Sequence, residues 1–337
     1  MMNGDFPIDD MLWLEASSFR DWHVDLDDIE KTVVFRPLRD GEATAQSIPS
    51  RVPQSMLPVR DAIAQVLKQK VGDSTVKSLS FPVGRLFFRG ERIRPGRYAL
   101  RLSPKVVQNL GELKLGAEAS QLLLDEDFRK GGLILVAGDT GSGKTTTAYA
   151  TVKERLARYG GYCLTVESPV EKELEGFHGD GYCEQVDATN TGFKSEVASA
   201  MRKFPAETRS MFFFGEVLDE EAAAELARLI GRGHLVITTI HSATMEQAIE
   251  MLIAFAERGG ETYARSLIGQ NLRAVVHQKL ENQRAMVRCL RVTQEVANII
   301  SDSAADLKTL ATAIDQQRRQ ASTQLLGRAA FQSQMRP

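Results

Sequence analysis

The sequence has few cysteines, no long apolar run and no strong excess of either charge. Its cysteines are Cys163, Cys183 and Cys289, an odd number without any C-x-x-C pair. This pattern argues against a disulfide scaffold and against a zinc site built from paired cysteines, and it fits a reducing compartment. Apolar runs such as 133–137 and 235–237 are too short to cross a bilayer. We therefore expect a cytoplasmic protein that would reach a membrane system by docking.

The charge balance argues against a globally basic nucleic-acid binder, because 42 Lys and Arg face 44 Asp and Glu. The first residues offer neither a basic segment nor an apolar one, so we expect no signal peptide. Apolar residues make up 43% of the 337 positions, which is enough for a sizeable core. The length favours two domains.

The first third of the chain predicts a small mixed domain. A β-branched and aromatic run at 31–38 indicates a strand, and the polar stretch 40–55 indicates a loop. Apolar spacing predicts a helix over 58–71. Alternation between 74 and 102 predicts three short antiparallel strands, and a helical connector is expected at 103–120.

Strands and helices then alternate. The expected strands are 133–137, 162–166, 211–214 and 235–240. The expected helices are 144–159, 193–204, 220–230 and 245–257. This alternation predicts an α/β domain with a parallel sheet covered on both faces. The last 60 residues are expected to be mostly helical, with a polar, fraying end.

A phosphate-binding loop is the strongest motif. The pattern G-x-x-x-x-G-K-[ST] is met by Gly138, Asp139, Thr140, Gly141, Ser142, Gly143, Lys144 and Thr145. An expected strand precedes it and an expected helix follows. The backbone amides of such a loop and the helix N-terminus bind phosphate oxygens. Lys144 should neutralise the β- and γ-phosphates of ATP, and the Thr145 hydroxyl should bind Mg²⁺.

Two glutamates follow expected strands. Glu167 comes after 162–166, and Glu216 comes two residues after 211–214. Ligands of open α/β sheets bind at the carboxyl ends of strands, so both carboxylates should face the γ-phosphate. Glu216 is the expected magnesium-shell residue, and Glu167 or Glu216 would orient the attacking water.

Two histidines bracket the expected strand at 235–240. His241 follows it and should lie beside the phosphate crevice, where an imidazole can bind a phosphate and respond to its loss. His234 precedes the strand and is the weaker of the two candidates for the same task.

The order of these motifs resembles the hexameric traffic ATPases of type II and type IV secretion and type IV pili, and most of all the pilus-retraction (PilT-like) motors. Residues 138–147 match the Walker A box, and residues 164–171 are similar to the aspartate box. Residues 212–219 resemble the atypical Walker B box, and residues 233–242 resemble the histidine box.

The resemblance implies a PAS-like N-terminal domain at 1–103, a linker at 104–120 and a RecA-like ATPase domain at 121–337. It also implies ATP and Mg²⁺ as ligands and a homohexameric ring. That ring would dock on the cytoplasmic face of an inner-membrane pilus or secretion platform, without nucleic acid.

The resemblance further implies that arginines on two N-terminal strands complete the nucleotide site in trans, and Arg89 and Arg101 are the best matches. Thr146 joins the nucleotide-binding segment. Three departures from the family pattern stand out: Ser168 replaces an aspartate, Leu218 replaces an arginine, and residues 203–205 replace an acidic stretch around the proline.

Two other functions stay open. The departures at Ser168 and Leu218 fit a nucleotide-binding regulatory subunit that hydrolyses almost nothing. A P-loop enzyme or helicase acting on a small molecule or nucleic acid is disfavoured, because the chain shows no basic and aromatic stripe. A turnover measurement separates the motor from the regulatory subunit.

Overall fold

The computed structural model divides the chain into two compact units. The N-terminal unit comprises Met1–Val107 with two short segments, Pro169–Glu173 and Asp187–Asn190, and the larger unit comprises the rest. The structure describes residues 8–37, 47–72, 77–84, 86–103, 107–189, 191–200, 202–205, 210–281 and 284–320. No helix in these described ranges is long and apolar enough to span a membrane.

The N-terminal unit combines helices with short strands. Its helices are α1 (Asp10–Ala16) and α2 (Leu57–Val71), with 3-10 turns η1 (Ile29–Lys31) and η2 (Gln54–Met56). Its strands are β1 (Asp21–Asp25), β2 (Val33–Pro37), β3 (Ser47–Arg51), β4 (Ser78–Val83), β5 (Leu86–Arg94) and β6 (Arg97–Ser103).

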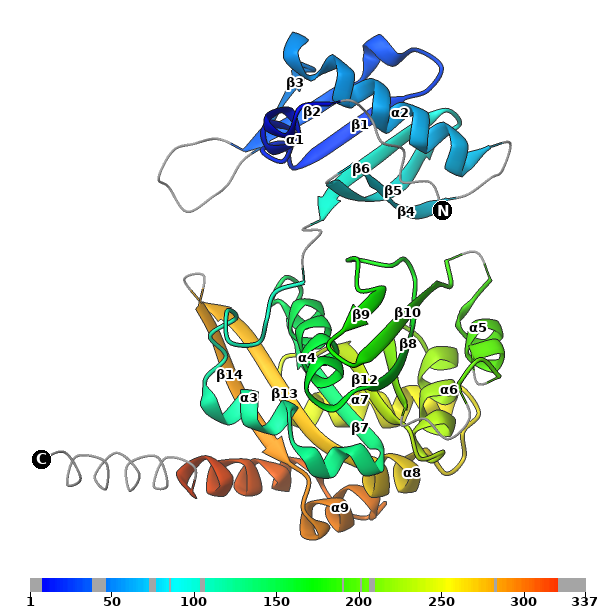
Figure 1. Cartoon of the computed structure of the whole chain (residues 1–337). Coiled ribbons are helices and arrows are strands. Elements are labelled where there is room, and N and C mark those ends of the chain that lie inside the picture. Colours follow the sequence, from blue (N-terminus) through cyan, green and yellow to red (C-terminus); the bar gives the residue numbers. More distant parts are fainter. Residues whose placement is uncertain are drawn as a thin grey trace, which may run out of the picture. The chain divides into compact units, whose positions relative to one another are not determined.

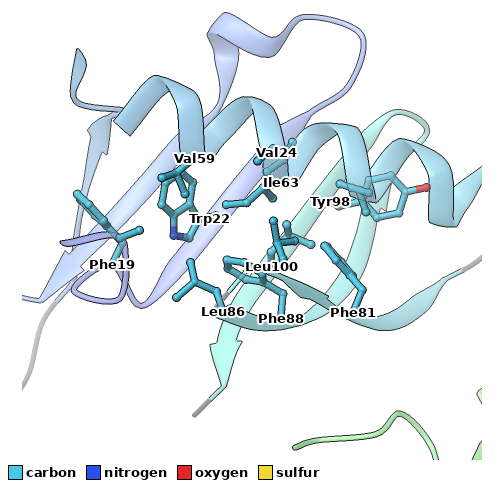
Figure 2. Close-up of a cluster of buried hydrophobic side chains, with 14 of the residues drawn as sticks. Phe19, Trp22, Val24, Val59, Ile63, Phe81, Leu86, Phe88, Tyr98 and Leu100 are labelled. Carbon is cyan, nitrogen blue, oxygen red and sulfur yellow. The ribbon is translucent and has the colours of Figure 1, made fainter. Parts of the chain in front are cut away.

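These six described strands form one antiparallel sheet in the order β3-β2-β1-β6-β5-β4 (Figure 1). Figure 2 shows the core beneath α2, where side chains of the sheet meet those of the helix. Trp22, Phe81 and Phe88 are fully buried there. Burial alternates along β4, as expected for a sheet with one apolar face.

Helix α2 forms because its apolar residues recur at helical spacing. Val59, Ile63 and Leu67 lie four residues apart and are fully buried. A proline occupies the first turn, where no amide donor is needed, and Gly72 ends the helix with a positive φ of 46°.

The larger unit contains the alternating elements. Its helices are α3 (Ala117–Leu123), α4 (Lys144–Tyr159), α5 (Phe193–Ala200), α6 (Glu220–Ile230), α7 (Met245–Arg258), α8 (Ala264–Asn271) and α9 (Gln294–Ser301), with 3-10 turns η3 (Glu126–Lys130) and η4 (Leu307–Thr309). Its strands are β7 (Gly132–Gly138), β8 (Gly161–Glu167), β9 (Gly176–His178), β10 (Gly181–Asp187), β11 (Ser210–Glu216), β12 (Leu235–His241), β13 (Leu272–Glu281) and β14 (Arg284–Arg291).

These strands form one sheet in the order β14-β13-β7-β12-β11-β8-β10-β9 among the described residues. Strands β13, β7, β12, β11 and β8 run parallel, and β14 pairs antiparallel with β13 at one edge. Every residue of β7 is buried, as expected for a central parallel strand.

Helices cover both faces of this sheet. Successive residues of a strand point to opposite faces, and two phenylalanines of β11 show which helix lies where. Phe213 packs edge-on against Tyr149 of α4 at 5.2 Å between ring centroids. Phe214 stacks on Phe193 of α5 at 4.9 Å. Helix α4 therefore covers one face, and α5 covers the other.

The predicted fold class is confirmed: the chain is α/β, with a parallel sheet in the larger unit and a smaller α+β unit before it. Both α4 and α6 have the predicted bounds. Helix α5, predicted over 193–204, ends at residue 200, and 201 lies outside the described residues.

The prediction of a mostly helical C-terminal region is wrong for residues 278–281 and 284–291. They belong to β13 and β14, which pair residue by residue from Ala274 with Arg291 to Glu281 with Arg284. The polar stretch 40–55 is also not all loop, because Ser47–Arg51 pairs with β2 as β3. In the expected helical connector the described helix begins at Ala117, with turns before it. Residues 104–106 and the expected fraying end after 320 lie outside the described residues.

Candidate nucleotide site

The P-loop lies at the carboxyl ends of parallel strands. It connects β7 to α4, and its first residue, Gly138, pairs in register with His241 at the end of β12. Gly143 caps α4 with a left-handed φ of 89°, a conformation that glycine adopts without strain. The first amides of a helix have no preceding turn to bond to, so this end of α4, which begins at Lys144, is suited to binding an anion.

Lys144 lies in the middle of this arrangement. Its side chain is almost fully enclosed, with the residue only 5% exposed. The ammonium group donates to the carbonyl oxygen of Asp139 at 3.1 Å and to Nδ1 of His241 at 3.0 Å. The loop backbone thus holds the lysine over the P-loop itself, where phosphates of a nucleotide would bind.

His241 links the lysine to an acid. Its Nε2 lies 2.9 Å from Oε1 of Glu216, which ends β11. Because the ammonium of Lys144 can only donate, Nδ1 of His241 accepts and Nε2 carries the proton that is donated to Glu216. The hydroxyl of Thr140 lies 3.4 Å from the same Nδ1. Three residues that the sequence predicted for the site, Lys144, His241 and Glu216, are therefore joined in one hydrogen-bonded chain.

Glu167 lies at the end of the neighbouring strand β8 and is only 2% exposed. Its carboxylate accepts hydrogen bonds from Thr165 Oγ1 at 2.7 Å, from Gln185 Nε2 at 3.1 Å and from the Tyr149 hydroxyl. A Cβ added to Gly215 would lie 3.4 Å from the Glu167 side chain. Glu167 therefore packs beside the residue that precedes Glu216, in a fixed orientation.

His234 lies at the other end of β12, in different surroundings. Its ring stacks on Phe204 at 4.6 Å, and its Nδ1 lies 2.7 Å from the Ser210 hydroxyl. Burial lowers the pKa of His234, and the charge of Arg232 lowers it further. The structure does not bring His234 to the P-loop of the same chain, and its predicted role stays a prediction.

Arg89 and Arg101 lie opposite each other on β5 and β6 of the N-terminal unit. Directly paired residues share a face of the sheet, so both side chains leave the same face. Arg101 is 68% exposed and forms an ion pair with Asp21 at 2.8 Å. Their predicted action in trans stays a prediction.

The residues present fit a magnesium nucleotide. Mg²⁺ is held by one or two protein oxygen ligands together with substrate phosphates, and Thr145 and Glu216 offer a hydroxyl and a carboxylate. A group of three or more His, Cys, Asp or Glu residues that could hold a metal is not found among the described residues. The Ser142 hydroxyl, buried in the loop, has no hydrogen-bond partner in the described structure.

Sequence reasoning missed four residues around this site: Tyr149, Thr165, Gln185 and Gln278. The first three surround Glu167, and Gln278 bonds to the P-loop from β13. Gln278 lies between His277 and Lys279 in β13, so no local pattern marks it as part of the site. Thr165 lies two residues before Glu167 on the same face of β8, which is the one local signal among the four. Tyr149 and Gln185 gave none, because they reach Glu167 from other elements.

The loop, strand order and covered parallel sheet define a P-loop protein of RecA-like ATPase fold. In line with this, the profile of the family described as "Type II/IV secretion system protein" matches residues 86–330. The chain belongs to that family, as the order of its sequence motifs had predicted.

Two relatives and one solved structure illustrate the similarity. "Type II secretion system protein E" of Pseudomonas aeruginosa is 34% identical over 189 residues, which are 55% of this chain and 34% of that protein. "Uncharacterized protein YggR" of Escherichia coli is 31% identical over 209 residues, 60% of this chain and 62% of that protein.

The solved structure titled "Crystal Structure of the Pilus Retraction Motor PilT and Bound ADP" has a TM-score of 0.67 and 21% identity, covering 91% of this chain and 89% of that one. At this identity the likeness supports the RecA-like fold alone. The match to the secretion protein covers about a third of its length.

Proposed function

We propose that this chain is a Mg²⁺-dependent ATPase that works as a homohexameric motor for a type IV pilus or a type II/IV secretion machine. The observation that carries the proposal is the chain of contacts from Lys144 through His241 to Glu216 beside the P-loop. Family membership and the retraction motor named in the matched structure support the mechanical task.

The P-loop amides and Lys144 would bind the phosphates and stabilise the charge that develops on the transferred phosphoryl group. His241 touches Lys144 directly, so a change at the γ-phosphate would alter the bonds of the imidazole. That contact supports the predicted role of His241 in reporting the phosphate to the rest of the ring.

The two glutamates would divide the remaining work. Glu216 and Thr145 would hold Mg²⁺, whose charge neutralises the phosphates when it is bound. Glu167 would orient the attacking water, because three donors hold its carboxylate in one position. A fixed acceptor loses little entropy when it binds a water molecule.

The oligomer and its location belong to the same proposal. Arg89 and Arg101 would complete the site of a neighbouring subunit, and the ring would dock on the cytoplasmic face of an inner-membrane platform. Hinge motion between the two units, driven by hydrolysis, is the type of movement that such a ring would use.

A regulatory subunit without turnover is the second candidate. Ser168 and Leu218 are exposed in the loops that follow the two glutamates, and Leu218 is a large apolar side chain that is 58% exposed. An arginine or aspartate lost from these loops would leave nucleotide binding intact and remove part of the catalytic charge.

Steady-state ATP hydrolysis with Mg²⁺ tests both candidates on the full chain. Purified wild-type protein should turn over ATP, and Lys144→Ala should abolish turnover. A wild-type protein that binds ATP but releases no phosphate would contradict the motor and favour the regulatory subunit. Ser168→Asp and Leu218→Arg would then be the first substitutions to restore activity.

A further inference from the structure

Strand β13 brings a buried glutamine to the P-loop. Gln278 is only 4% exposed, although glutamine is mostly a surface residue. The register of β13 with β7 pairs Gln278 with Gly138, the first residue of the loop. On the other side of β7, the same Gly138 pairs with His241. The P-loop therefore begins between a strand that carries His241 and a strand that carries Gln278.

Both ends of the Gln278 amide are hydrogen-bonded across the junction of loop and helix. Its Nε2 donates to the carbonyl oxygen of Ser142, and its Oε1 accepts from the Thr147 hydroxyl at 2.8 Å. Lys144 and Thr145 lie between these two anchor points. One planar amide thus fixes the spacing between the end of the loop and the first turn of α4.

The same side chain also packs against the loop. A Cβ added to Gly143 would lie 2.8 Å from Nε2 of Gln278. A Cβ added to Gly138 would collide with the backbone carbonyl oxygen of Gln278. The side chain of residue 278 therefore lies against Gly143, and its backbone lies against Gly138.

We propose that Gln278 is a positioning residue of the nucleotide site. By holding the Ser142 carbonyl and the Thr147 hydroxyl, it keeps the amides of residues 141–145 in the orientation that binds phosphate. It acts through the loop and does not contact the nucleotide. A loop that is already ordered binds with a smaller entropy loss, so Gln278 should strengthen nucleotide binding. The binding consequence rests on the proposed function, whereas the ordering of the loop does not.

Gln278→Leu tests the proposal, because leucine is similar in size and makes neither hydrogen bond. We would measure hydrogen exchange of peptides covering residues 138–147 without added nucleotide, and the affinity for a fluorescent ADP with Mg²⁺. We expect about tenfold faster exchange and about tenfold weaker ADP binding, from the loss of two buried hydrogen bonds.

Thr147→Val removes half of the contact and leaves the bond to Ser142. It should weaken ADP binding by about threefold, less than Gln278→Leu. Because both substitutions break the same link, the double variant should bind ADP no more weakly than Gln278→Leu alone. If the losses of ADP affinity in the two single variants multiplied in the double variant, the proposal that Gln278 acts through Thr147 would be contradicted.

Val276→Ala is the matched control for a general loss of packing. Val276 is buried two residues earlier on the same face of β13 and pairs with Val136, away from the loop. Its truncation should lower the melting temperature without selectively changing the exchange of residues 138–147 or the ADP affinity. If Gln278→Leu behaved like Val276→Ala in both measurements, the proposal would be wrong.

Two outcomes, an unfolded Gln278→Leu and a wild-type protein that does not bind ADP, leave the proposal testable. If Gln278→Leu does not fold, Gln278→Asn replaces it, because the shorter amide cannot reach both anchors and should also weaken ADP binding. If the wild-type protein binds no ADP, the proposed function fails, while faster exchange in Gln278→Leu still supports the ordering role. Unchanged exchange in both Gln278 variants would overturn the inference in either case.

Discussion

The two ends of strand β12 carry the same residue type in opposite environments. At the carboxyl end, His241 lies between an ammonium group and a carboxylate, with Lys144 at 3.0 Å and Glu216 at 2.9 Å. At the amino end, His234 stacks on Phe204 and pairs with the Ser210 hydroxyl. One histidine thus has charged partners, whereas the other has aromatic and neutral ones.

The difference follows from the direction of a parallel sheet. Loops that leave the carboxyl ends of the strands gather the P-loop and both glutamates at one edge. The strand between the two histidines spans about 20 Å, so His234 cannot hydrogen-bond a phosphate held by the P-loop of the same chain. The position of a histidine along β12, and not its residue type, therefore decides whether it can contact the phosphates. His241 can, and His234 cannot within the same chain.

The largest expected effect on turnover is at Glu216, the acid that faces His241. Glu216→Gln removes the charge that faces His241 and Mg²⁺, and kcat should fall on the order of 10²-fold or more. ATP binding should remain, because the P-loop and Lys144 are unchanged. Turnover and ATP affinity of the purified variant check this.

Glu220→Gln is the matched control for Glu216→Gln. Glu220 begins α6 four residues later and pairs with Arg258 on the surface, so its loss should leave kcat within about twofold, as for most exposed ion pairs. Near wild-type turnover in Glu216→Gln would contradict its assignment to the site.

Paired substitutions of the two histidines test the comparison directly. His241→Gln should lower kcat by about tenfold or more, because the imidazole that bonds to both Lys144 and Glu216 is lost. His234→Gln should leave kcat within about twofold, since its surroundings lie a strand's length from the phosphates. Both are measured at saturating ATP.

Equal losses in the two histidine variants would break the comparison. His234 would then act on hydrolysis by a route other than contact within one chain, for instance through the ring that the family resemblance implies. The melting temperature of each variant shows whether a loss of activity reflects unfolding.

A third comparison concerns the two tyrosines that hold carboxylates near β8. Tyr149 donates to the buried Glu167, and Tyr162 donates to Glu184. Tyr149→Phe should reduce kcat by about threefold to tenfold with little change in KM, because one of three bonds that orient Glu167 is lost. Tyr162→Phe should leave kcat unchanged. A loss of the same size in both variants would show that the effect is one of packing.

The sequence predicted what local patterns encode. The P-loop, its strand and its helix are contiguous, so one motif places Lys144 and Thr145. Glu216 and His241 could be placed because each follows an apolar strand of a parallel sheet. The partners of Glu167 could not be predicted, because Tyr149 and Gln185 reach it from other elements.

The long hairpin of β13 and β14 was missed for a related reason. The arginines of β14 stand at 284, 288 and 291, and this spacing of four and three residues suits the exposed face of a helix as well as a strand. The edge strand β3 is exposed along its whole length and has almost no apolar signal. Both elements are defined by their pairing with the preceding strand, β13 for β14 and β2 for β3, and their own residue patterns do not show that pairing.

The smallest expected effect is on the pH dependence of stability. It should differ between the wild type, which has His234, and a variant with a residue there that does not titrate. Burial lowers the pKa of His234 in the folded protein below the ordinary value of 6.5, so the unfolded chain binds its proton more readily. Above about pH 6.5 both states are neutral and the residue adds no pH dependence. As the pH falls below that value, protonation of the unfolded state lowers the free energy of unfolding.

His234→Phe should therefore reduce the drop in melting temperature between pH 7.5 and pH 5.5. Phenylalanine keeps the ring stacked on Phe204 but has no titrating nitrogen, although it leaves the Ser210 hydroxyl without its partner. The variant should be less stable than the wild type at pH 7.5, and the difference should narrow on acidification. Part of the drop should remain, because His277 is also buried with a lowered pKa. If the melting temperatures of the two proteins fell by the same amount between pH 7.5 and pH 5.5, a lowered pKa of His234 would be contradicted.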